Sequence, residues 1–438
     1  MGILIKIIQL ILSLALLVFI HELGHFLFAK LFKIRVNKFY LFFDIKGALL
    51  RYKPKNSETE YGIGWLPLGG YCQIDGMVDE SLALEGLESE PKPWEFRAHP
   101  TWQRLLVMLG GVLFNVILAI LIYGGMAYAW GTNQLPIENV GDNLTYSSVG
   151  HDMGLKDGDL PIAIDGKEIK YFEGFLIQEI ANGDNLTVLR DNQPVDIVIP
   201  ADFMRAVIAS QEAFFMLDLP ARIDSVAPNS AALRDGLKVG DTLVAVNAKP
   251  MNKLSKILPA IQELKGDSIT LKVKRGEAYY ELRTMPDKET GLGIGFTPPV
   301  KVFEQEHTKY GALESIPAGV HEAAKQIASY TDQLKYVATP EGASSLGGLG
   351  TMGSLFSARF DWNRFWNMTA FLSVILAVMN ILPIPGLDGG HIMFIIYEVI
   401  VGKAPSLKWQ TRFQLIGMLF LIFLVLYANI NDIFRFFM

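Results

Sequence analysis

The sequence predicts a multi-pass α-helical membrane protein with a large water-soluble insertion. Half of the 438 residues are hydrophobic and only 19% are charged, a composition typical of a membrane protein with a substantial soluble part. Four stretches are long and apolar enough to cross a bilayer. The more polar residues 131–364 separate the second stretch from the third. The length itself suggests about three structural units.

The charge distribution argues against nucleic-acid binding, and the cysteine content argues against a cysteine-rich zinc site. The net charge is −6, and the basic residues are scattered along the chain rather than gathered into one stripe, so we expect no nucleic-acid binding. Cys72 is the single cysteine. It permits no intramolecular disulfide and rules out a cysteine-rich zinc site, so a bound metal would need histidine and carboxylate ligands.

The first apolar stretch, residues 3–32, contains the pattern His-Glu-x-x-His at His21, Glu22 and His25. Residues four apart lie on the same face of a helix, so both imidazoles can reach one metal ion, and Glu22 borders its open position as a general base. Two such histidines can also be packing or solvated residues. Histidine is scarce in this chain, however, and ionisable residues inside membrane segments are commonly functional. We therefore expect a metal site.

Basic residues beside the apolar stretches predict their orientation. Lys30, Lys33, Arg35 and Lys38 flank the motif end of the first stretch, so this end is expected on the cytoplasmic side and the N-terminus outside. A cleaved signal peptide is the competing interpretation, but no small-residue cleavage site follows. Arg97 and Arg104 precede the second stretch, and basic residues also precede the fourth. This alternation places residues 131–364 and both termini on the extracytoplasmic side.

Residues 39–77 are expected to form short strands rich in aromatic residues and glycine, at 39–43, 48–52 and 61–66. Two or three β-hairpins with few charges could enter the membrane where their backbone is buried in protein or lines a wet cavity. An ordinary cytoplasmic sheet fits the pattern equally well.

The second apolar stretch, residues 105–130, contains Gly110, Gly111 and Asn115. Small residues allow two helices to approach closely, and a buried asparagine needs a partner. We therefore expect this face to pack against the first helix.

The segment between the second and third stretches contains an internal repeat. The run Gly-Leu-Lys-x-Gly-Asp occurs at residues 154–159 and again at 236–241, and an apolar strand follows each copy. Such a turn feeding a strand resembles PDZ domains, and two tandem copies argue against coincidence. PDZ domains bind peptide ends by adding a strand to a sheet edge. The residues leave open whether these copies hold a ligand or act as bulky gates.

Beyond the repeat, Ile316, Val320, Ile327 and Leu334 approximate helical spacing. This pattern predicts an amphipathic connector that lies near the membrane or on the second copy of the repeat.

Two prolines and three glycines break the third apolar stretch between Asn380 and His391. Asp388 lies at this break and could simply cap a helix. It is also the only carboxylate between Asp361 and Glu398, which makes it the candidate third metal ligand. His391 is the weaker alternative, because three protein ligands and a water already fill a catalytic zinc site.

Together, these motifs resemble the site-2 protease family of intramembrane zinc proteases over essentially the whole length. The resemblance is carried by His21-Glu22-x-x-His25, Pro67-Leu68-Gly69-Gly70-Tyr71, the tandem copies and Asn380-x-x-Pro383-x-Pro385-x-Leu387-Asp388-Gly389. It implies that His21, His25 and Asp388 hold Zn²⁺, that Glu22 activates a water, and that Asn380, Pro383 and Pro385 bind the substrate.

The resemblance also implies a biological setting. The substrates would be single-pass transmembrane proteins already shortened by another protease, of the anti-sigma factor or signal-peptide remnant type. The enzyme would lie in the bilayer of a bacterial inner membrane, with its active site near the cytoplasmic side. The β-hairpins would be a membrane-reentrant element that guides an unwound substrate strand.

The chain departs from the family pattern at two places. Phe42-Phe43-Asp44 stands where the family usually has a Gly-Phe-Gly type of turn, and Gly110-Gly111 stands where relatives commonly have Gly-Pro. The first departure affects the hairpin geometry, and neither touches a proposed ligand.

Two other classes of function compete with a zinc endopeptidase. A non-catalytic PDZ membrane scaffold would not need Glu22. A metal transporter would spread its ligands along a path rather than pair them with a general base.

The expected domain organisation follows from these assignments. In chain order the segments are 1–38 (first transmembrane helix), 39–77 (reentrant β-hairpin region), 78–104 (cytoplasmic linker), 105–130 (second helix), 131–218 and 219–300 (two PDZ domains), 301–364 (connector), 365–402 (third helix), 403–412 (cytoplasmic loop) and 413–434 (fourth helix).

Overall fold

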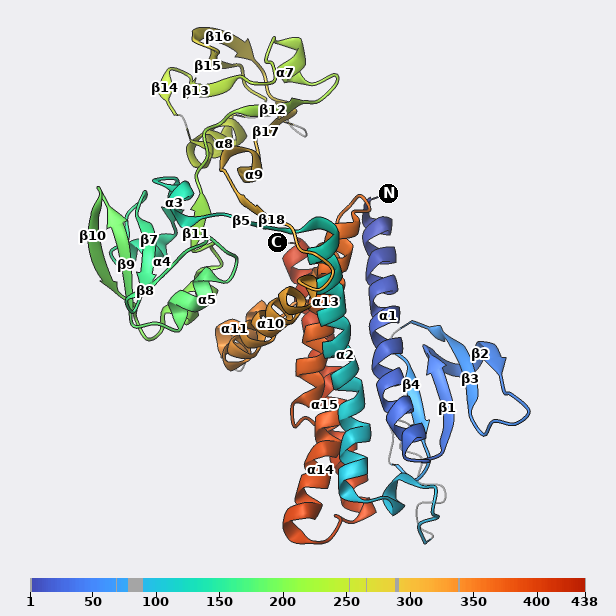
Figure 1. Cartoon of the computed structure of the whole chain (residues 1–438). Helices are drawn as coiled ribbons and strands as arrows, with labels where there is room; N and C mark the ends of the chain where they lie inside the picture. Colours follow the sequence, from blue (N-terminus) through green and yellow to red (C-terminus); the bar gives the residue numbers. More distant parts are fainter. Residues whose placement is uncertain are drawn as a thin grey trace. The chain divides into compact units, whose positions relative to one another are not determined.

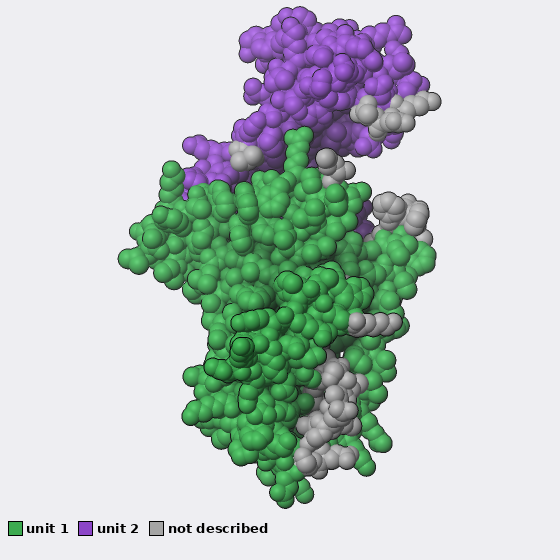
Figure 2. Space-filling model, turned by 90° about the vertical axis from the view of Figure 1, so that its right-hand side faces the viewer, with its two compact units in different colours: residues 1–132, 309–438 green, residues 133–308 purple. Residues whose placement is uncertain are grey.

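The computed structural model divides the chain into two compact units. It describes residues 2–67, 69–77, 90–251, 253–264, 266–287, 291–337 and 339–437. Unit 1 comprises Met1–Thr132 with Lys309–Met438, and unit 2 comprises Asn133–Thr308 (Figure 2). Leu68 of the Pro-Leu-Gly-Gly motif and most of the acidic linker, residues 78–89, lie outside the described residues.

Unit 1 is built on long apolar helices. Within the described part of the chain, four helices are long and apolar enough to cross a membrane. This finding confirms the prediction of a multi-pass membrane protein. The helices are α1 (Gly2–Leu31), α2 (Thr101–Trp130), α13 (Trp362–Ile381) and α15 (Leu407–Phe437).

Helix α2 lies at the centre of this bundle, in contact with α1, α13 and α10 (Ser315–Val337) (Figure 1). Ala323 of α10 is buried against α2 and α13, and Ile327 and Leu334 pack beside it. The connector predicted from helical spacing therefore packs on the membrane helices. Its other two predicted apolar positions, Ile316 and Val320, are exposed.

The third apolar stretch forms two helices, as the prolines and glycines predicted. Helix α13 ends at Ile381, and α14 (Asp388–Val401) begins after a turn. Short helical segments complete unit 1: η1 (Phe96–Ala98), α11 (Pro340–Ser345) and α12 (Leu349–Ser354).

Residues 36–74 form a four-stranded sheet with the order β2-β3-β1-β4. Strands β2 and β3 form an antiparallel hairpin, whereas β1 pairs with β3 in parallel and with β4 antiparallel. The expectation of two or three hairpins is therefore wrong for the described residues of this region. The strands are β1 (Val36–Leu41), β2 (Phe43–Tyr52), β3 (Glu60–Leu66) and β4 (Tyr71–Ile74).

Burial explains the unexpected pairing. Val36 and Tyr40 of β1 are almost fully buried, whereas Leu49 and Leu50 of β2 are 67% and 64% exposed. Strand β1, whose side chains pack inside the protein, is therefore central in the sheet, and β2 is an edge.

Unit 2 contains two successive α+β copies with matching topology. The four-stranded sheets have the orders β10-β9-β7-β8 and, read from the other edge, β16-β15-β13-β14, and each copy adds a two-stranded sheet. The first copy comprises β6 (Leu144–Tyr146), α4 (Ser148–Asp152), β7 (Leu160–Ile164), β8 (Lys167–Glu168), α5 (Leu176–Ala181), β9 (Asn185–Arg190), β10 (Gln193–Val198), α6 (Phe203–Ser210) and β11 (Phe215–Leu217). The second comprises β12 (Ile223–Val226), α7 (Ala231–Arg234), β13 (Thr242–Val246), β14 (Lys249–Pro250), α8 (Leu254–Glu263), β15 (Ile269–Arg275), β16 (Ala278–Thr284) and β17 (Ile294–Phe296).

Short elements flank the two copies. They are β5 (Thr132–Gln134), α3 (Ile137–Val140), α9 (Pro299–Val302) and β18 (Glu306–Thr308).

Each copy buries the final aspartate of its Gly-Leu-Lys-x-Gly-Asp turn against an arginine. Arg190 donates to Asp159 at 2.8 and 2.6 Å, and Arg275 donates to Asp241 at 2.6 and 2.7 Å. Both arginines also donate to the carbonyl of the first glycine of their turn. The two sequence copies therefore make the same bidentate ion pair.

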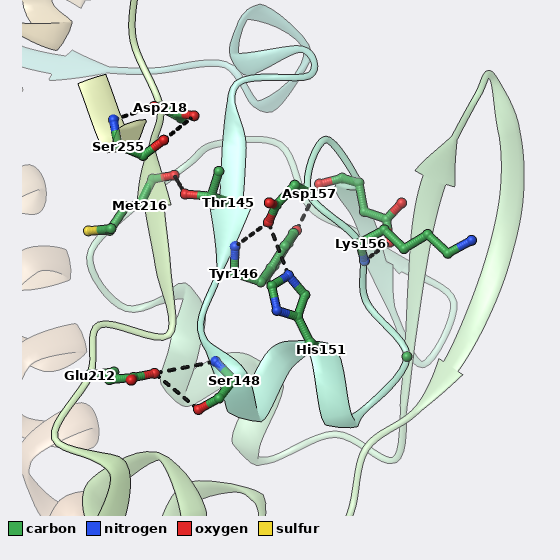
Figure 3. Close-up of polar contacts among 12 residues, drawn as sticks. Thr145, Tyr146, Ser148, His151, Lys156, Asp157, Glu212, Met216, Asp218 and Ser255 are labelled. Carbon is green, nitrogen blue, oxygen red and sulfur yellow. Dashed lines mark hydrogen bonds and ion pairs between the residues drawn. The ribbon is translucent and has the colours of Figure 1, made fainter. Parts of the chain in front are cut away.

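The first copy has polar contacts around its turn at Asp157 and at Ser148 (Figure 3). Asp157 accepts a hydrogen bond from the Tyr146 N–H at 3.0 Å and lies 3.1 Å from His151 Nε2. The equivalent residue in the second copy is Val239, which is 63% exposed. Glu212 accepts two hydrogen bonds from Ser148.

Asp218 connects the end of the first copy to helix α8 of the second (Figure 3). Its carboxylate accepts hydrogen bonds from the Ser255 N–H at 3.0 Å and the Ser255 hydroxyl at 2.8 Å. Because these bonds form in the first turn of α8, Asp218 satisfies a backbone donor that the helix itself leaves unpaired.

We expect Asp241→Asn to lower the free energy of unfolding of the second copy by about 2–4 kcal/mol at pH 7, because Arg275 would lose its charged partner. Burial acts to raise the pKa of the Asp241 carboxyl, but hydrogen bonds from Arg275 and from the Lys238 N–H outweigh it and lower that pKa. The stabilisation is therefore present above about pH 4 and is lost as the pH falls through the lower folded-state pKa. Hydrogen exchange of the β13 and β15 amides in the full-length protein measures it.

Asp224→Asn is the matched control for this prediction. Asp224 pairs with Lys301 at 2.8 Å, but the Lys301 side chain is 58% exposed. Exposed pairs contribute less than about 1 kcal/mol, so exchange should change little. Equal exchange in the two variants would contradict a structural role for the buried pair.

Candidate metal centre

The candidate site lies between α1 and α2, which run side by side (Figure 1) and approach each other closely at Gly24 and Gly110. A Cβ atom placed on Gly110 would lie 2.6 Å from the Gly24 carbonyl oxygen, so only glycine allows this contact. His21 and His25 are both buried at this close approach. The structure thus agrees with the expectation that the small-residue face of the second helix packs against the first.

Helix α2 presents one stripe of residues to the two histidines. Val107, Gly111 and Asn115 are spaced four apart and therefore lie on one face of the helix. The Val107 carbonyl is 2.8 Å from His25 Nδ1, and the Asn115 amide nitrogen is 3.1 Å from His21 Nδ1. Helix α2 therefore contacts both imidazoles at Nδ1 and leaves their Nε2 atoms available for other partners.

The turn between α13 and α14 brings Asp388 to the same place. The turn is fixed from α15, because Gln414 Oε1 accepts a hydrogen bond from the Gly386 N–H at 2.5 Å. Helix α14 is fixed to α2 by an ion pair between Arg104 and Glu398 at 2.6 Å. Asp388 is therefore held by contacts on both sides of the break.

The three candidate ligand atoms form a nearly equilateral triangle. His21 Nε2 and His25 Nε2 are 3.2 Å apart, and they lie 3.1 and 3.3 Å from Asp388 Oδ2. Zinc bonds of about 2.0–2.1 Å at tetrahedral angles place ligand atoms roughly 3.3–3.4 Å apart. The triangle therefore has the size of one face of a zinc tetrahedron, with the fourth position left for a water or a substrate.

Proton positions also favour a cation at this place. The Val107 carbonyl can only accept, so His25 carries its proton on Nδ1. When the ring is neutral, its Nε2 lone pair faces Asp388 Oδ2, which is buried and accepts no hydrogen bond of normal geometry. Two such electron pairs repel unless a cation lies between them. The residues present therefore fit a metal ion.

Glu22, the candidate general base, follows His21 on α1. Its carboxylate accepts a hydrogen bond from the backbone N–H of Cys72 in β4, and it lies close enough to His21, His25 and Asp388 for their charges to act on it. Sequence reasoning missed this contact, because nothing in the sequence around Cys72 signals it.

The other predicted residues lie at the break in the third stretch. The Asn380 amide nitrogen is 3.4 Å from His21 Nε2, and the residue is buried. Pro383 is exposed and Pro385 is partly buried in the turn. His391 lies outside the ligand triangle, and its Nε2 is 2.9 Å from the side-chain nitrogen of Gln414. Gln414 at the start of the long apolar run of α15 was the sequence signal that could have identified this contact.

Comparison with known proteins shows what this chain is similar to. The pattern of Peptidase family M50 matches residues 9–424. A putative zinc metalloprotease of Borreliella burgdorferi is 29% identical over 440 residues, covering 97% of each chain. The regulator of sigma E protease of Haemophilus influenzae is 28% identical over 450 residues, covering 97% of this chain and 98% of that protein. The regulator of sigma-E protease RseP of Escherichia coli is 26% identical over 449 residues, covering 97% of each chain.

We expect Gly111→Ala to weaken metal binding by roughly 10–100-fold, the range found when a change beside the ligands displaces them. A Cβ atom at this position would lie 2.5 Å from both His21 Cε1 and His25 Nε2. The affinity for Zn²⁺ is measured by competition with a chelator of known affinity.

Gly125→Ala, in the same helix, is the control, because a Cβ atom there has no neighbour within 4 Å. It should leave the affinity for Zn²⁺ unchanged. Unaltered affinity in Gly111→Ala would show that the ligands do not need the space this glycine leaves.

Proposed function

We propose that this chain, which belongs to peptidase family M50 and is a metalloendopeptidase of the site-2 protease type, cleaves peptide bonds within the membrane with Zn²⁺ held by His21, His25 and Asp388. The observation that carries the proposal is the triangle of ligand atoms in which two histidines of a membrane-compatible helix, α1, meet Asp388 of α14. Ligands that converge on one point beside a glutamate suit hydrolysis better than transport along a path.

The chemistry that Zn²⁺ supplies when bound is polarisation of the scissile carbonyl and acidification of a water. Glu22 takes the proton from the attacking water and later returns it to the leaving amine. The Cys72 N–H keeps the Glu22 carboxylate oriented for both transfers. Asn380, which lies beside the ligand atom of His21, is placed to donate a hydrogen bond to the substrate backbone.

A transmembrane substrate must unwind before its carbonyl can be attacked, since a helix satisfies its own backbone groups. Strand β4 is an edge of the sheet, and its Cys72 contacts Glu22. Pairing with this edge would keep the unwound segment extended and satisfy its backbone close to the general base. The exposed apolar side chains of β2 support a sheet that enters the membrane.

The two copies in unit 2, residues 131–218 and 219–300, are proposed to be PDZ domains that exclude substrates with bulky extracytoplasmic parts. Two of the relatives are named regulators of sigma-E protease. By that similarity, the substrates would be single-pass membrane proteins of the anti-sigma factor type, or signal-peptide remnants. The setting would be a bacterial inner membrane, with both termini and unit 2 outside and the active site near the cytoplasmic side.

We expect Glu22→Gln to abolish cleavage of a model transmembrane peptide and to leave the zinc content at the wild-type level, because the amide cannot accept the proton from water. Peptide cleavage and bound zinc are measured on the same purified sample, with a chelator-treated wild type as the inactive reference. If this variant cleaved the peptide at the wild-type rate, Glu22 would not be the general base.

We expect Asp388→Asn to lose bound zinc, because a neutral amide oxygen is a much weaker ligand than a carboxylate. Metal analysis of the purified variant measures the loss. His391→Gln is the control and should retain zinc, since His391 contacts Gln414 outside the triangle. If zinc were lost only in His391→Gln, His391 rather than Asp388 would be the third metal ligand.

A further inference from the structure

Asn115 of α2 is the residue at the metal centre to which no role has yet been assigned. It is fully buried, and its amide nitrogen lies 3.1 Å from His21 Nδ1. Its side-chain oxygen is buried and has no hydrogen-bond partner. A buried amide oxygen without a partner is energetically costly, so this orientation of the amide needs an explanation.

Two side-chain amides contact His21, and both direct an NH₂ group at a ring nitrogen. One imidazole ring cannot accept hydrogen bonds at both of its nitrogens. Asn115 directs its NH₂ group at Nδ1, and Asn380 directs its NH₂ group at Nε2. A neutral imidazole has one N–H and one acceptor nitrogen, and a charged one has two N–H groups. His21 therefore cannot accept from both, and at least one amide must present its oxygen.

Metal binding decides which nitrogen carries the proton. Nε2 is the atom of His21 that lies 3.1 Å from Asp388 Oδ2 and 3.2 Å from His25 Nε2. It must be unprotonated to serve as a ligand, so the proton of the neutral ring is on Nδ1. The group that contacts Nδ1 must then be an acceptor.

We propose that Asn115 is a positioning residue whose side-chain oxygen accepts a hydrogen bond from His21 Nδ1–H and thereby directs the Nε2 lone pair at the metal. The proposal rests on the metal site assigned above. It requires only that the side-chain amide turn by half a rotation, so that its oxygen and nitrogen exchange places. The two groups have nearly the same size, so the rotation fits the same space. The rotation gives the oxygen a donor in His21 Nδ1–H and moves the NH₂ group to the position that the oxygen held.

The same arrangement already holds for the second histidine. The Val107 carbonyl accepts from His25 Nδ1–H at 2.8 Å and leaves Nε2 free to bind. Val107 and Asn115 lie on one stripe of α2, eight residues apart, and they face histidines that are four apart on α1. A single helix face therefore supplies one acceptor for each ligand, and outer acceptors of this kind orient ligating histidines in metal sites.

The backbone of Asn115 is itself held in place, which favours a positioning role. The Ser373 hydroxyl of α13 donates to the Asn115 carbonyl oxygen at 2.8 Å, and Ser373 is fully buried. This contact leaves the amide of Asn115 untouched. Ser373→Ala therefore provides a control that alters the same interface without changing the partner of His21.

The test compares Asn115→Leu, Asn115→Asp and Ser373→Ala in the full-length protein in detergent. Zinc affinity is measured by chelator competition, and the visible spectrum of the Co²⁺-loaded protein reports ligand geometry. We expect roughly 10–100-fold weaker zinc binding in Asn115→Leu, with an altered Co²⁺ spectrum. Asn115→Asp, which can only accept when ionised, should bind zinc at least as tightly as the wild type. Ser373→Ala, which keeps the Asn115 amide, should weaken zinc binding far less than Asn115→Leu does.

Two results would overturn the proposal. Unchanged zinc affinity in Asn115→Leu would show that the contact does not matter. Weakening in Asn115→Asp as large as in Asn115→Leu would show that His21 needs a donor or only the packing of an amide. Because aspartate has nearly the shape of asparagine, its result stands even if the leucine variant fails to fold. Absence of zinc binding in the wild type would instead contradict the proposed function.

Discussion

The close approach of α1 and α2 is the contact on which the rest of the site depends. Glycines at positions 24 and 110 bring the two backbones together, and Gly111 leaves space for the imidazole rings. At a larger separation the Val107 carbonyl could not reach His25, and Asn115 could not reach His21. The proposed metal ligands are thus oriented by a helix that contributes no ligand itself.

Because the groups that orient the two imidazoles are buried, leaving any of them without a hydrogen-bond partner is energetically costly. Polar groups removed from water must find partners inside the protein, particularly within a bilayer. Here each partner has a second contact: Asn115 is held by Ser373, the turn before Asp388 by Gln414, and α14 by the pair of Arg104 and Glu398. The third and fourth membrane helices therefore support the site through contacts one step away from the ligands.

Unit 2 shows how one sequence pattern gives the same local structure twice. The aspartate that ends each Gly-Leu-Lys-x-Gly-Asp turn pairs with an arginine from the corresponding strand of its sheet. The copies differ two residues before this aspartate, where Asp157 contacts His151 and Val239 is exposed. The shared ion pair maintains the common fold, whereas the differing position gives the two copies different surfaces.

The sequence by itself determined the features that depend on local patterns. Apolar length predicted the four membrane helices, spacing placed His21 and His25 on one face, and prolines and glycines predicted the break before Asp388. Only the tertiary structure decided which distant groups meet: the parallel pairing of β1 with β3, the packing of α10 on α2, the contact of Cys72 with Glu22, and that of Asn115 with His21. These partners are chosen by burial and shape across segments far apart in the chain, and no periodicity within one segment encodes that choice.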